Sequence, residues 1–518
     1  MIRARLLGVV ALAVVGVAAT AQAATTDVGC TRDRVAVAHD SAGHAISPAP
    51  RQLVPCATET GFYVGETGIG VTKQGTVWFS AANREWALAR TRDSGAHWDA
   101  FSVPGPQAFP GCNFAVSPVT CQDSESAKDN TVADAYLYVD PTTSKLFWAK
   151  TYGEALCSSL SMSPDDGASW QSVPTFACPG GDYEKLAAGP PPAGGPTPVG
   201  YPNVVYVCTN GPAPTFVVGP ARICYKSLDG GTTWANTGAP PVPSPLAPGC
   251  AQFQEPQRVG PDGTLYLPLT CGLLGQLPTA SVRVAISHDE GQTWSYSEVP
   301  SGGATNNAGF LGGVSLDIDR GGTVYVVWPG TDGKAYLAAS KDQGTTWNGP
   351  LTASAPGVKQ AGAPFAQVAA LEPGHVAIAY YGYTGTDTKR LDGYLTESFN
   401  AADPKPIFYT GLLNDPAQPL YFAVKSGSLP RNDFLGVTIA PDGTPWTALT
   451  KLRSDSPDSE GFIQSTGYAG RLVAVNDLQG TAPARVKSPS KKTAKKKRRA
   501  TKKRRKSAHA RVKPVFTG

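Results

Sequence analysis

The sequence predicts an all-β fold built from repeated units, and three observations lead to this prediction. The pattern Ser/Thr-x-Asp-x-Gly-x-x-Trp occurs five times along the chain. Glycine and proline are abundant, with 57 and 46 residues among 518, which is typical of a protein with many tight turns. Short runs of Val, Ile, Tyr, Trp and Leu alternate with these turns, and long amphipathic helix patterns are missing. Such repeats in one long chain predict a β-propeller.

The repeated pattern, called the Asp-box below, is spaced like the blades of a propeller. Its aspartates follow one another at intervals of 72, 64, 60 and 53 residues, which fit one four-stranded blade plus loops. We expect each aspartate to accept hydrogen bonds from N–H groups of its turn, and we interpret it as structural, because residues repeated in every blade belong to the scaffold. These aspartates are Asp93, Asp165, Asp229, Asp289 and Asp342.

A strand–turn–strand unit precedes each Asp-box and occurs twice more without a clear box. The resulting count of hairpins favours seven blades, with six as the alternative. The run Arg34–Ala38 could supply an outer strand that closes the ring and removes an exposed edge. The turns lie at 74–75, 143–144, 261–263, 320–322, 372–374 and 441–443, and the third hairpin is expanded by residues 189–200.

The N-terminus has the form of a secretory signal. Arg3 and Arg5 precede an apolar run, and a small-residue cleavage site lies at 21–23. No later stretch is apolar and long enough to span a bilayer, so the sequence predicts a secreted protein that is extracellular or associated with the cell surface. The predicted segments are a signal peptide (1–23), an N-terminal segment that could close the ring (24–60), the propeller (61–478) and a disordered tail (479–518).

The cysteines agree with export, because their number is even and an exported chain forms disulfides. A metal site is disfavoured, since there is no C-x-x-C pair and the six histidines are scattered. The sequence leaves the connectivity open, and we expect sequential neighbours to pair. The expected pairs are Cys30–Cys56, Cys112–Cys121, Cys157–Cys178, Cys208–Cys224 and Cys250–Cys271.

The charge of the chain is divided between two parts. Residues 485–513 contain sixteen Lys or Arg and no Asp or Glu. The rest of the chain therefore holds 29 basic and 40 acidic residues. A run of like charges cannot bury a core, so we expect a disordered tail that attracts an anionic cell-envelope polymer or another polyanion.

The five Asp-boxes resemble those of the sialidase (neuraminidase) superfamily, also called BNR-repeat proteins, over about residues 60 to 475. The resemblance implies Asp-boxes on outer hairpins and a ligand site at the mouth of the central channel, where the innermost strands begin. Active sialidases of that family hold the substrate carboxylate with three arginines, the first in an Arg-Ile-Pro motif, which this sequence lacks. Arg258 and Arg431 are the arginines near expected inner-strand starts, and with Asp433 they are the candidate substrate-binding residues.

Acidic residues occupy several of the expected inner-strand starts. Asp134, Asp182 and Glu66 are the candidate catalytic residues, because two carboxylates at one channel mouth could act as general acid and base in glycoside hydrolysis. Several carboxylates together could instead bind Ca²⁺, although no cofactor is otherwise expected. The simplest alternative is that these side chains cap strands. Glu184, Glu255 and Asn307 lie at similar positions.

Two functions remain open at this point. The chain could be a secreted sialidase-like propeller that acts on or binds a glycan or glycoconjugate, with exo-acting glycoside hydrolysis as its chemistry. Alternatively, it could be a non-catalytic propeller that binds at the cell surface, anchored electrostatically by its basic tail.

Overall fold

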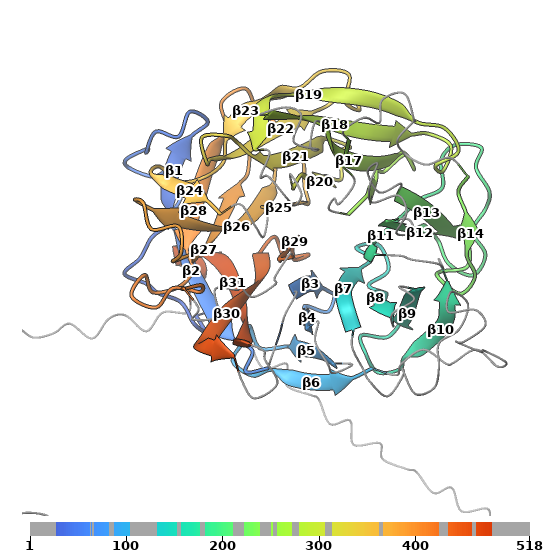
Figure 1. The fold of residues 1–518 in the computed structure, drawn as a ribbon, viewed down its shortest axis with the longest axis horizontal. Coiled ribbons are helices and arrows are strands. Elements are labelled where there is room, and N and C mark those ends of the chain that lie inside the picture. Colours follow the sequence, from blue (N-terminus) through green and yellow to red (C-terminus); the bar gives the residue numbers. More distant parts are fainter. Residues whose placement is uncertain are drawn as a thin grey trace, which may run out of the picture. The chain divides into compact units, whose positions relative to one another are not determined.

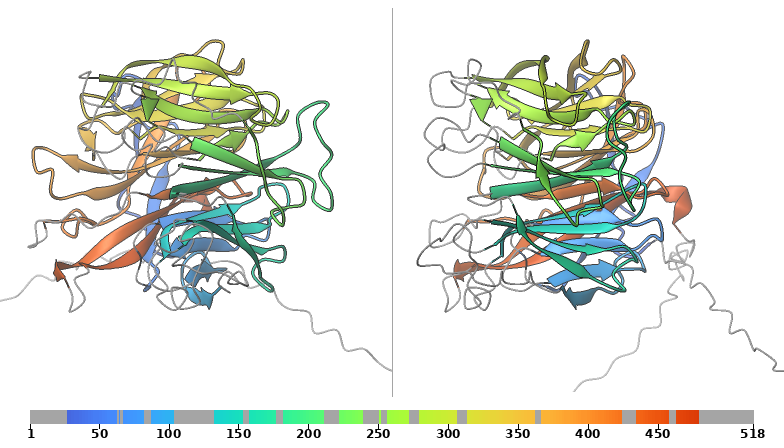
Figure 2. Two further views of the ribbon diagram at one scale, coloured as in Figure 1. Left: turned by 45° about the vertical axis from the view of Figure 1, so that its right-hand side comes forward. Right: turned by 90° about the vertical axis from the view of Figure 1, so that its right-hand side faces the viewer.

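The chain folds as a β-propeller of seven blades arranged around a central channel (Figure 1), and this confirms the all-β fold predicted above. In the side views of Figure 2, the strands run roughly along the axis of the ring. The computed structural model describes residues 27–62, 64, 67–81, 87–103, 132–152, 157–176, 182–210, 222–238, 250–251, 256–271, 279–305, 313–361, 366–423, 434–457 and 463–478.

Each blade is an antiparallel sheet that the chain enters at its inner strand. Blade one has β3 (Thr67–Val71), β4 (Val77–Ala81), β5 (Ala87–Thr91) and β6 (Asp99–Ser102). Blade two has β7 (Val132–Val139), β8 (Leu146–Tyr152), β9 (Cys157–Ser163) and β10 (Gln171–Phe176). Blade three has β11 (Asp182–Gly189), β12 (Val204–Asn210), β13 (Arg222–Ser227) and β14 (Ala235–Asn236).

The remaining blades repeat this pattern with small additions. Blade four has β15 (Cys250–Ala251), β16 (Arg258–Val259), β17 (Leu265–Cys271), β18 (Thr279–Ser287) and β19 (Ser295–Thr305). Blade five has β20 (Ser315–Ile318), β21 (Val324–Pro329), β22 (Ala335–Ser340) and β23 (Asn348–Thr352). Blade six has β24 (Val358–Gln360), β25 (Gln367–Ala370), β26 (Val376–Thr384), β27 (Asp392–Ser398) and β28 (Ile407–Leu412). Blade seven has β29 (Gly436–Ile439), β30 (Pro445–Pro457) and β31 (Ile463–Ala474), followed by the 3₁₀ helix η3 (Val475–Asp477).

The N-terminal segment closes the ring through β2 (Leu53–Glu59), which pairs with β31 as the outer strand of blade seven. This strand lies further along the chain than Arg34–Ala38, where the sequence analysis placed a closing strand. Val37 and Ala38 belong instead to β1 (Val37–Asp40), which pairs with β28 and extends blade six. Both runs are short and apolar, so their composition does not distinguish which sheet edge each one covers.

The first hairpin of most blades turns on a glycine at its tip. Gly75 has a φ of 82° and Gly263 a φ of 85°, a region that side chains with a Cβ rarely adopt. Two backbone hydrogen bonds close each of these turns. In the first turn, Gly75 N donates to Thr72 O at 2.9 Å and Thr72 N donates to Thr76 O at 3.0 Å. The turns connect each inner strand to the second strand of its blade.

The hydrophobic core lies between the blades, because the second strand of each sheet is buried on both faces. In β4, Trp78 packs with Leu137 and Trp148 of blade two, whereas the next residue, Phe79, packs with Trp446 of blade seven. Successive side chains of a strand point to opposite faces, so adjacent aromatic residues serve two different interfaces.

Two of the expected cysteine pairs are disulfide bonds in the structure, Cys30–Cys56 and Cys208–Cys224. Cys271 is also disulfide-bonded, and the backbone of Cys250 lies opposite it in β15 and β17. Cys112, Cys121 and Cys178 fall outside the described residues, as does the side chain of Cys157. Among the described residues, no helix is long and apolar enough to cross a membrane.

Candidate functional site

The inner strands of the blades surround the centre of the ring (Figure 1), and residues of these strands line a small cavity there. These strands are β3, β7, β11, β16, β25 and β29, and β20 completes the circle. The cavity therefore collects side chains that are far apart in the sequence. Its lining includes Thr67, Tyr136, Lys185, Arg258, Gln367 and Phe434.

A lysine places a buried positive charge in the wall of this cavity. Lys185 is only 1% exposed, and its Nζ lies 3.4 Å from the ring centroid of Phe434 and 5.1 Å from that of Tyr136. The faces of aromatic rings attract cations, and this attraction is stronger where water is excluded. The preceding residue, Glu184, is fully buried and points to blade two, where its Oε1 accepts a hydrogen bond from Ser158 Oγ at 3.0 Å.

Arg258, one of the candidate substrate-binding residues, is held by the protein itself. Its Nε donates to Asp317 Oδ1 at 2.7 Å and its Nη1 to the carbonyl oxygen of Gln257 at 3.1 Å. The other oxygen of Asp317 accepts from Ala370 N at 2.8 Å, so the pair connects blades four, five and six. Burial opposes the charge of Arg258, but Tyr136 and Asp317 outweigh it and raise the pKa of the guanidinium. This arginine lines the cavity while stabilising its wall.

An amide group in the cavity wall has unused hydrogen-bond donors. Gln367 is 5% exposed, and its Oε1 accepts from Ser315 Oγ at 3.1 Å. Its Nε2 is buried and finds no hydrogen-bond partner within the described part of the chain. Buried polar groups are nearly always hydrogen-bonded in folded proteins, so an unpaired amide in a cavity indicates a place for a ligand or water oxygen.

The carboxylates proposed from the sequence lie at or beyond the edge of the described structure. The backbones of Asp134 and Asp182 belong to the starts of β7 and β11, neighbouring inner strands that contact each other, and their side chains are not described. The other candidates fall outside the described residues, namely Glu66, Glu255, Asn307, Arg431 and Asp433. Their convergence at one channel mouth therefore stays a prediction.

The sequence analysis missed the residues that give the cavity its chemistry. Tyr136 and Lys185 lie within inner strands rather than at their starts, Gln367 begins β25, and Phe434 precedes β29. Lys185 carried a usable signal, because a lysine inside an otherwise strand-like run must either reach solvent or find a buried partner. Gln367 and Phe434 carried no comparable signal.

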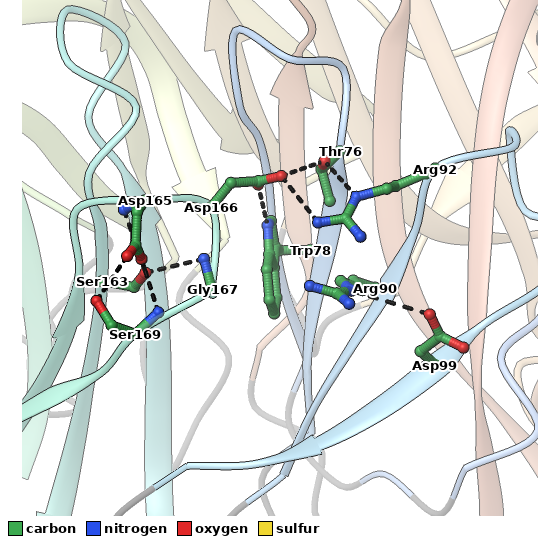
Figure 3. Close-up of polar contacts among 10 residues, drawn as sticks. All are labelled: Thr76, Trp78, Arg90, Arg92, Asp99, Ser163, Asp165, Asp166, Gly167 and Ser169. Carbon is green, nitrogen blue, oxygen red and sulfur yellow. Dashed lines mark hydrogen bonds and ion pairs between the residues drawn. The ribbon is translucent and has the colours of Figure 1, made fainter. Parts of the chain in front are cut away.

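The Asp-box aspartates lie far from this cavity, in the turns between the third and fourth strands of five blades. In blade two, Asp165 Oδ1 accepts from Ser163 Oγ at 2.9 Å and from Ser169 N at 2.8 Å, while Gly167 N donates to Ser163 Oγ at 2.8 Å (Figure 3). The same bonds recur around Asp93, Asp229, Asp289 and Asp342.

The degenerate box of blade six keeps part of this arrangement. Ser398 Oγ lies 3.4 Å from Asn400 Oδ1, and Asn400 N donates to Ser398 Oγ at the same distance. Asn400 thus takes the place of the aspartate. Among the described residues, no group of three or more His, Cys, Asp or Glu could hold a metal ion.

Comparisons with known proteins add a partial similarity in sequence. No family model matches the chain. A xyloglucanase from a Paenibacillus species is 29% identical over 223 residues, which make up 41% of this chain and 20% of that protein. The chain thus matches about a fifth of the length of this relative.

Solved structures with similar folds include enzymes that act on sugars. The NanB sialidase of Streptococcus pneumoniae has a TM-score of 0.44 and 11% identity, with 87% of this chain and 93% of that chain covered. The α-L-arabinanase of Penicillium chrysogenum has a TM-score of 0.38 and 13% identity, with 70% and 98% covered. The intramolecular trans-sialidase of Ruminococcus gnavus has a TM-score of 0.37 and 13% identity, with 86% and 96% covered.

Identities this low concern the fold alone. The architecture follows from the strands themselves, since seven sheets surround one channel and five of them carry an Asp-box turn. The chain is a seven-bladed β-propeller whose hairpins carry Asp-box turns.

Proposed function

We propose that this propeller is an exported glycan-binding protein that binds a sugar at the mouth of its central channel, above the small cavity that the inner strands line. The unpaired Nε2 of Gln367 is the observation that carries the proposal, because Gln367 lines the cavity and a buried amide donor without a partner among the described residues requires an oxygen from elsewhere. Sugar hydroxyl groups are suitable acceptors. The xyloglucanase relative, whose name denotes an enzyme acting on a glycan, supports the same ligand class.

The other cavity residues suit a sugar as well. Phe434 and Tyr136 supply aromatic surface, and Thr67, Lys185 and Gln367 supply polar groups from different blades. Small-molecule sites commonly combine apolar or aromatic walls with a few polar groups that set the orientation of the ligand.

Hydrolysis is the finer form of this proposal and depends on the carboxylates at the inner-strand starts. Asp134 and Asp182 begin neighbouring strands, so they are the pair that we propose as general acid and base, with Glu66 as the next candidate. The alternative is a propeller that binds a glycan without cleaving it.

The test of binding is an oligosaccharide array that contains neutral sugars and sialosides, with titration of whatever binds. Replacing Gln367→Met keeps the side-chain length and removes the amide donors, so we expect affinity to fall by about 3- to 10-fold. The matched control is Gln418→Met, an exposed glutamine in a turn of blade six. Equal affinity of the two variants would contradict the proposal.

Cleavage is tested separately with fluorogenic glycosides, including a sialoside. If Asp134 and Asp182 are catalytic, Asp134→Asn and Asp182→Asn should abolish turnover while binding on the array persists. A wild-type protein that binds glycans and cleaves none of these substrates would establish the non-catalytic alternative.

The basic tail favours a second role in retention at a surface. Its sixteen Lys or Arg between 485 and 513 stand against no acidic residue, and the rest of the chain has more acidic than basic residues. We propose that the tail binds an anionic polymer of the cell envelope and so anchors the exported propeller, because dense like charge attracts polyanions without needing a folded site.

A further inference from the structure

A second concave site lies on blades six, seven and one. It is a groove of about 1,100 Å³, lined in part by the hairpin turns Lys73–Gly75 and Pro441–Thr444. The central cavity is lined by residues that precede these turns, such as Thr67 and Gly436, and the two sites share no residue. The groove is thus separate from the site proposed above.

One wall of the groove carries a layered stack of side chains. The Cζ atom of Arg51 lies 4.0 Å from the ring centroid of Phe399, and the His375 ring stacks on Phe399 with centroids 4.9 Å apart. His375 is fixed in turn, because its Nε2 lies 2.8 Å from Glu397 Oε1 and both side chains are buried. The aromatic platform beneath Arg51 is therefore held in place.

The guanidinium of Arg51 lies over the Phe399 ring and interacts electrostatically with Glu397. Arg51 is exposed, and in the part of the chain that the structure describes its guanidinium forms no hydrogen bond or ion pair. A guanidinium carries its N–H donors in a planar fork that matches a carboxylate. Arg51 therefore offers the groove a donor set suited to an anion.

A second cation lies in the same groove. Arg471 is 4% exposed, and its Cζ lies 5.0 Å from the ring centroid of Trp446. Burial lowers the pKa of Arg471 to about 10, so the group stays charged at neutral pH. Its Nη2 donates to the carbonyl oxygen of Val28 at 3.1 Å, which fixes its orientation.

The acidic residues of the groove limit the charge of its ligand. Glu397 is turned to His375, with 3% of its side chain exposed, and burial raises its pKa. Asp442 and Asp477 are exposed and also line the groove. Their carboxylates would repel a polyanion, whereas a ligand with a single acid group can pair with Arg51 and avoid them.

We propose that this groove is a second saccharide site, which binds an oligosaccharide through one uronic acid whose carboxylate pairs with Arg51. The choice of a saccharide rather than another carboxylic acid rests on the proposed function. The volume of the groove is at the upper end for small-ligand sites and exceeds that of a single small acid.

The experiment is calorimetric titration of the full-length protein with a trisaccharide that carries one glucuronate on two xylose units. Xylotriose is the neutral comparison. We expect the acidic sugar to bind at least 10-fold more tightly than xylotriose, and Arg51→Met to remove this preference, since a hydrogen bond to a charged group is among the stronger ones. Arg51→Lys, which keeps the charge without the planar fork, should recover only part of it.

The basic tail also attracts acids, so the site itself must be observed. Modification of arginines with a dicarbonyl reagent, followed by peptide mass spectrometry, should show Arg51 protected by the acidic sugar and the exposed Arg390 unprotected. Equal modification of Arg51 with and without the sugar would overturn the proposal, as would an unchanged preference in Arg51→Met.

Two comparisons separate this proposal from the previous one. Gln367→Met should leave the protection of Arg51 by the acidic trisaccharide unchanged, because the two sites share no residue. An acetylated dipeptide with one free carboxylate that protects Arg51 as well as the sugar does would refute the saccharide class. Loss of binding in Gln367→Met alone would assign the acidic sugar to the central cavity and refute the groove.

Discussion

Burial decides what the titratable side chains of this propeller do. Lys185 is buried against two aromatic rings and lines a cavity, whereas its neighbour Glu184 is buried against a serine of the preceding blade. Glu397 is buried as well and is bound by His375. The same residue types at the surface would be solvated and would say nothing about a site.

His39 is a buried histidine that should make the stability of the protein depend on pH. It is fully buried in β1, its Nε2 lies 3.0 Å from Thr410 Oγ1, and burial lowers its pKa to about 4. The unfolded chain takes up this proton near pH 6.5, so the free energy of unfolding should fall as the pH drops from about 6.5 to about 4. Urea denaturation at pH 7.5 and pH 5 measures the loss.

The control is the exposed histidine of the same segment, His44. His39→Gln should reduce the difference in stability between the two pH values, while His44→Gln should leave it nearly unchanged. A His39→Gln variant with the full wild-type pH dependence would show that other groups cause the loss.

Among the structural elements, the Asp-box turn forms contacts between neighbouring blades. Asp166 follows the box aspartate of blade two and reaches blade one, where it accepts from Trp78 Nε1 at 3.0 Å and pairs with Arg92 at 3.2 Å (Figure 3). In blade four, Glu290 at the same position pairs with Lys226 of blade three. Each turn therefore stabilises the interface with the preceding blade as well as its own hairpin.

The glycine of the Asp-box is required both by its backbone conformation and by the packing between blades. A Cβ on Gly167 would lie 2.3 Å from Cη2 of Trp78, and its φ is +80°. Gly167→Ala should therefore lower the free energy of unfolding by about 3 kcal/mol, from backbone strain plus overpacking of the blade interface. Urea denaturation at neutral pH provides the measurement.

Gly194 is the matched comparison, because its φ is +78° and nothing lies within 4 Å of an added Cβ. Gly194→Ala should cost only the backbone term, about 1 kcal/mol. If the two alanine variants were equally stable, packing against Trp78 would not be the reason for glycine in the box.

For the whole molecule, the notable feature is the division of charge along the chain. All sixteen charged residues between positions 485 and 513 are Lys or Arg. The rest of the chain contains 29 basic and 40 acidic residues. Opposite charges in two parts of one protein allow the tail to bind a polyanion while the propeller is repelled by it.

Deletion of residues 485–518 tests this division. The full-length protein should elute from an immobilised polyanion such as heparin at a much higher salt concentration than the truncated one, because binding through many cations weakens steeply with salt. A variant with the tail lysines and arginines replaced by glutamine serves as the control for length. Elution of all three proteins at the same salt concentration would contradict the anchoring role.

The repeats made the fold predictable, since five Asp-boxes and seven hairpins lie in order along the chain. Local patterns of this kind depend on neighbours in sequence, such as Asp165 with Ser163 and Gly167, whose contacts span only a few residues. The closing strand was harder, because β2 pairs with β31 from the opposite end of the propeller.

The candidate sites, unlike the fold, could not be predicted from local sequence patterns. The sequence by itself determined the all-β class and the basic tail and favoured seven blades over six, because each follows from local repeats or composition, while the peripheral place of Asp93 and its equivalents followed from the family resemblance. Only the tertiary structure placed Gln367 and Lys185 in the lining of one cavity and Arg51 against Phe399 in the groove. The physical reason is that closing the ring places residues hundreds of positions apart within contact distance, and no local pattern records which of them meet.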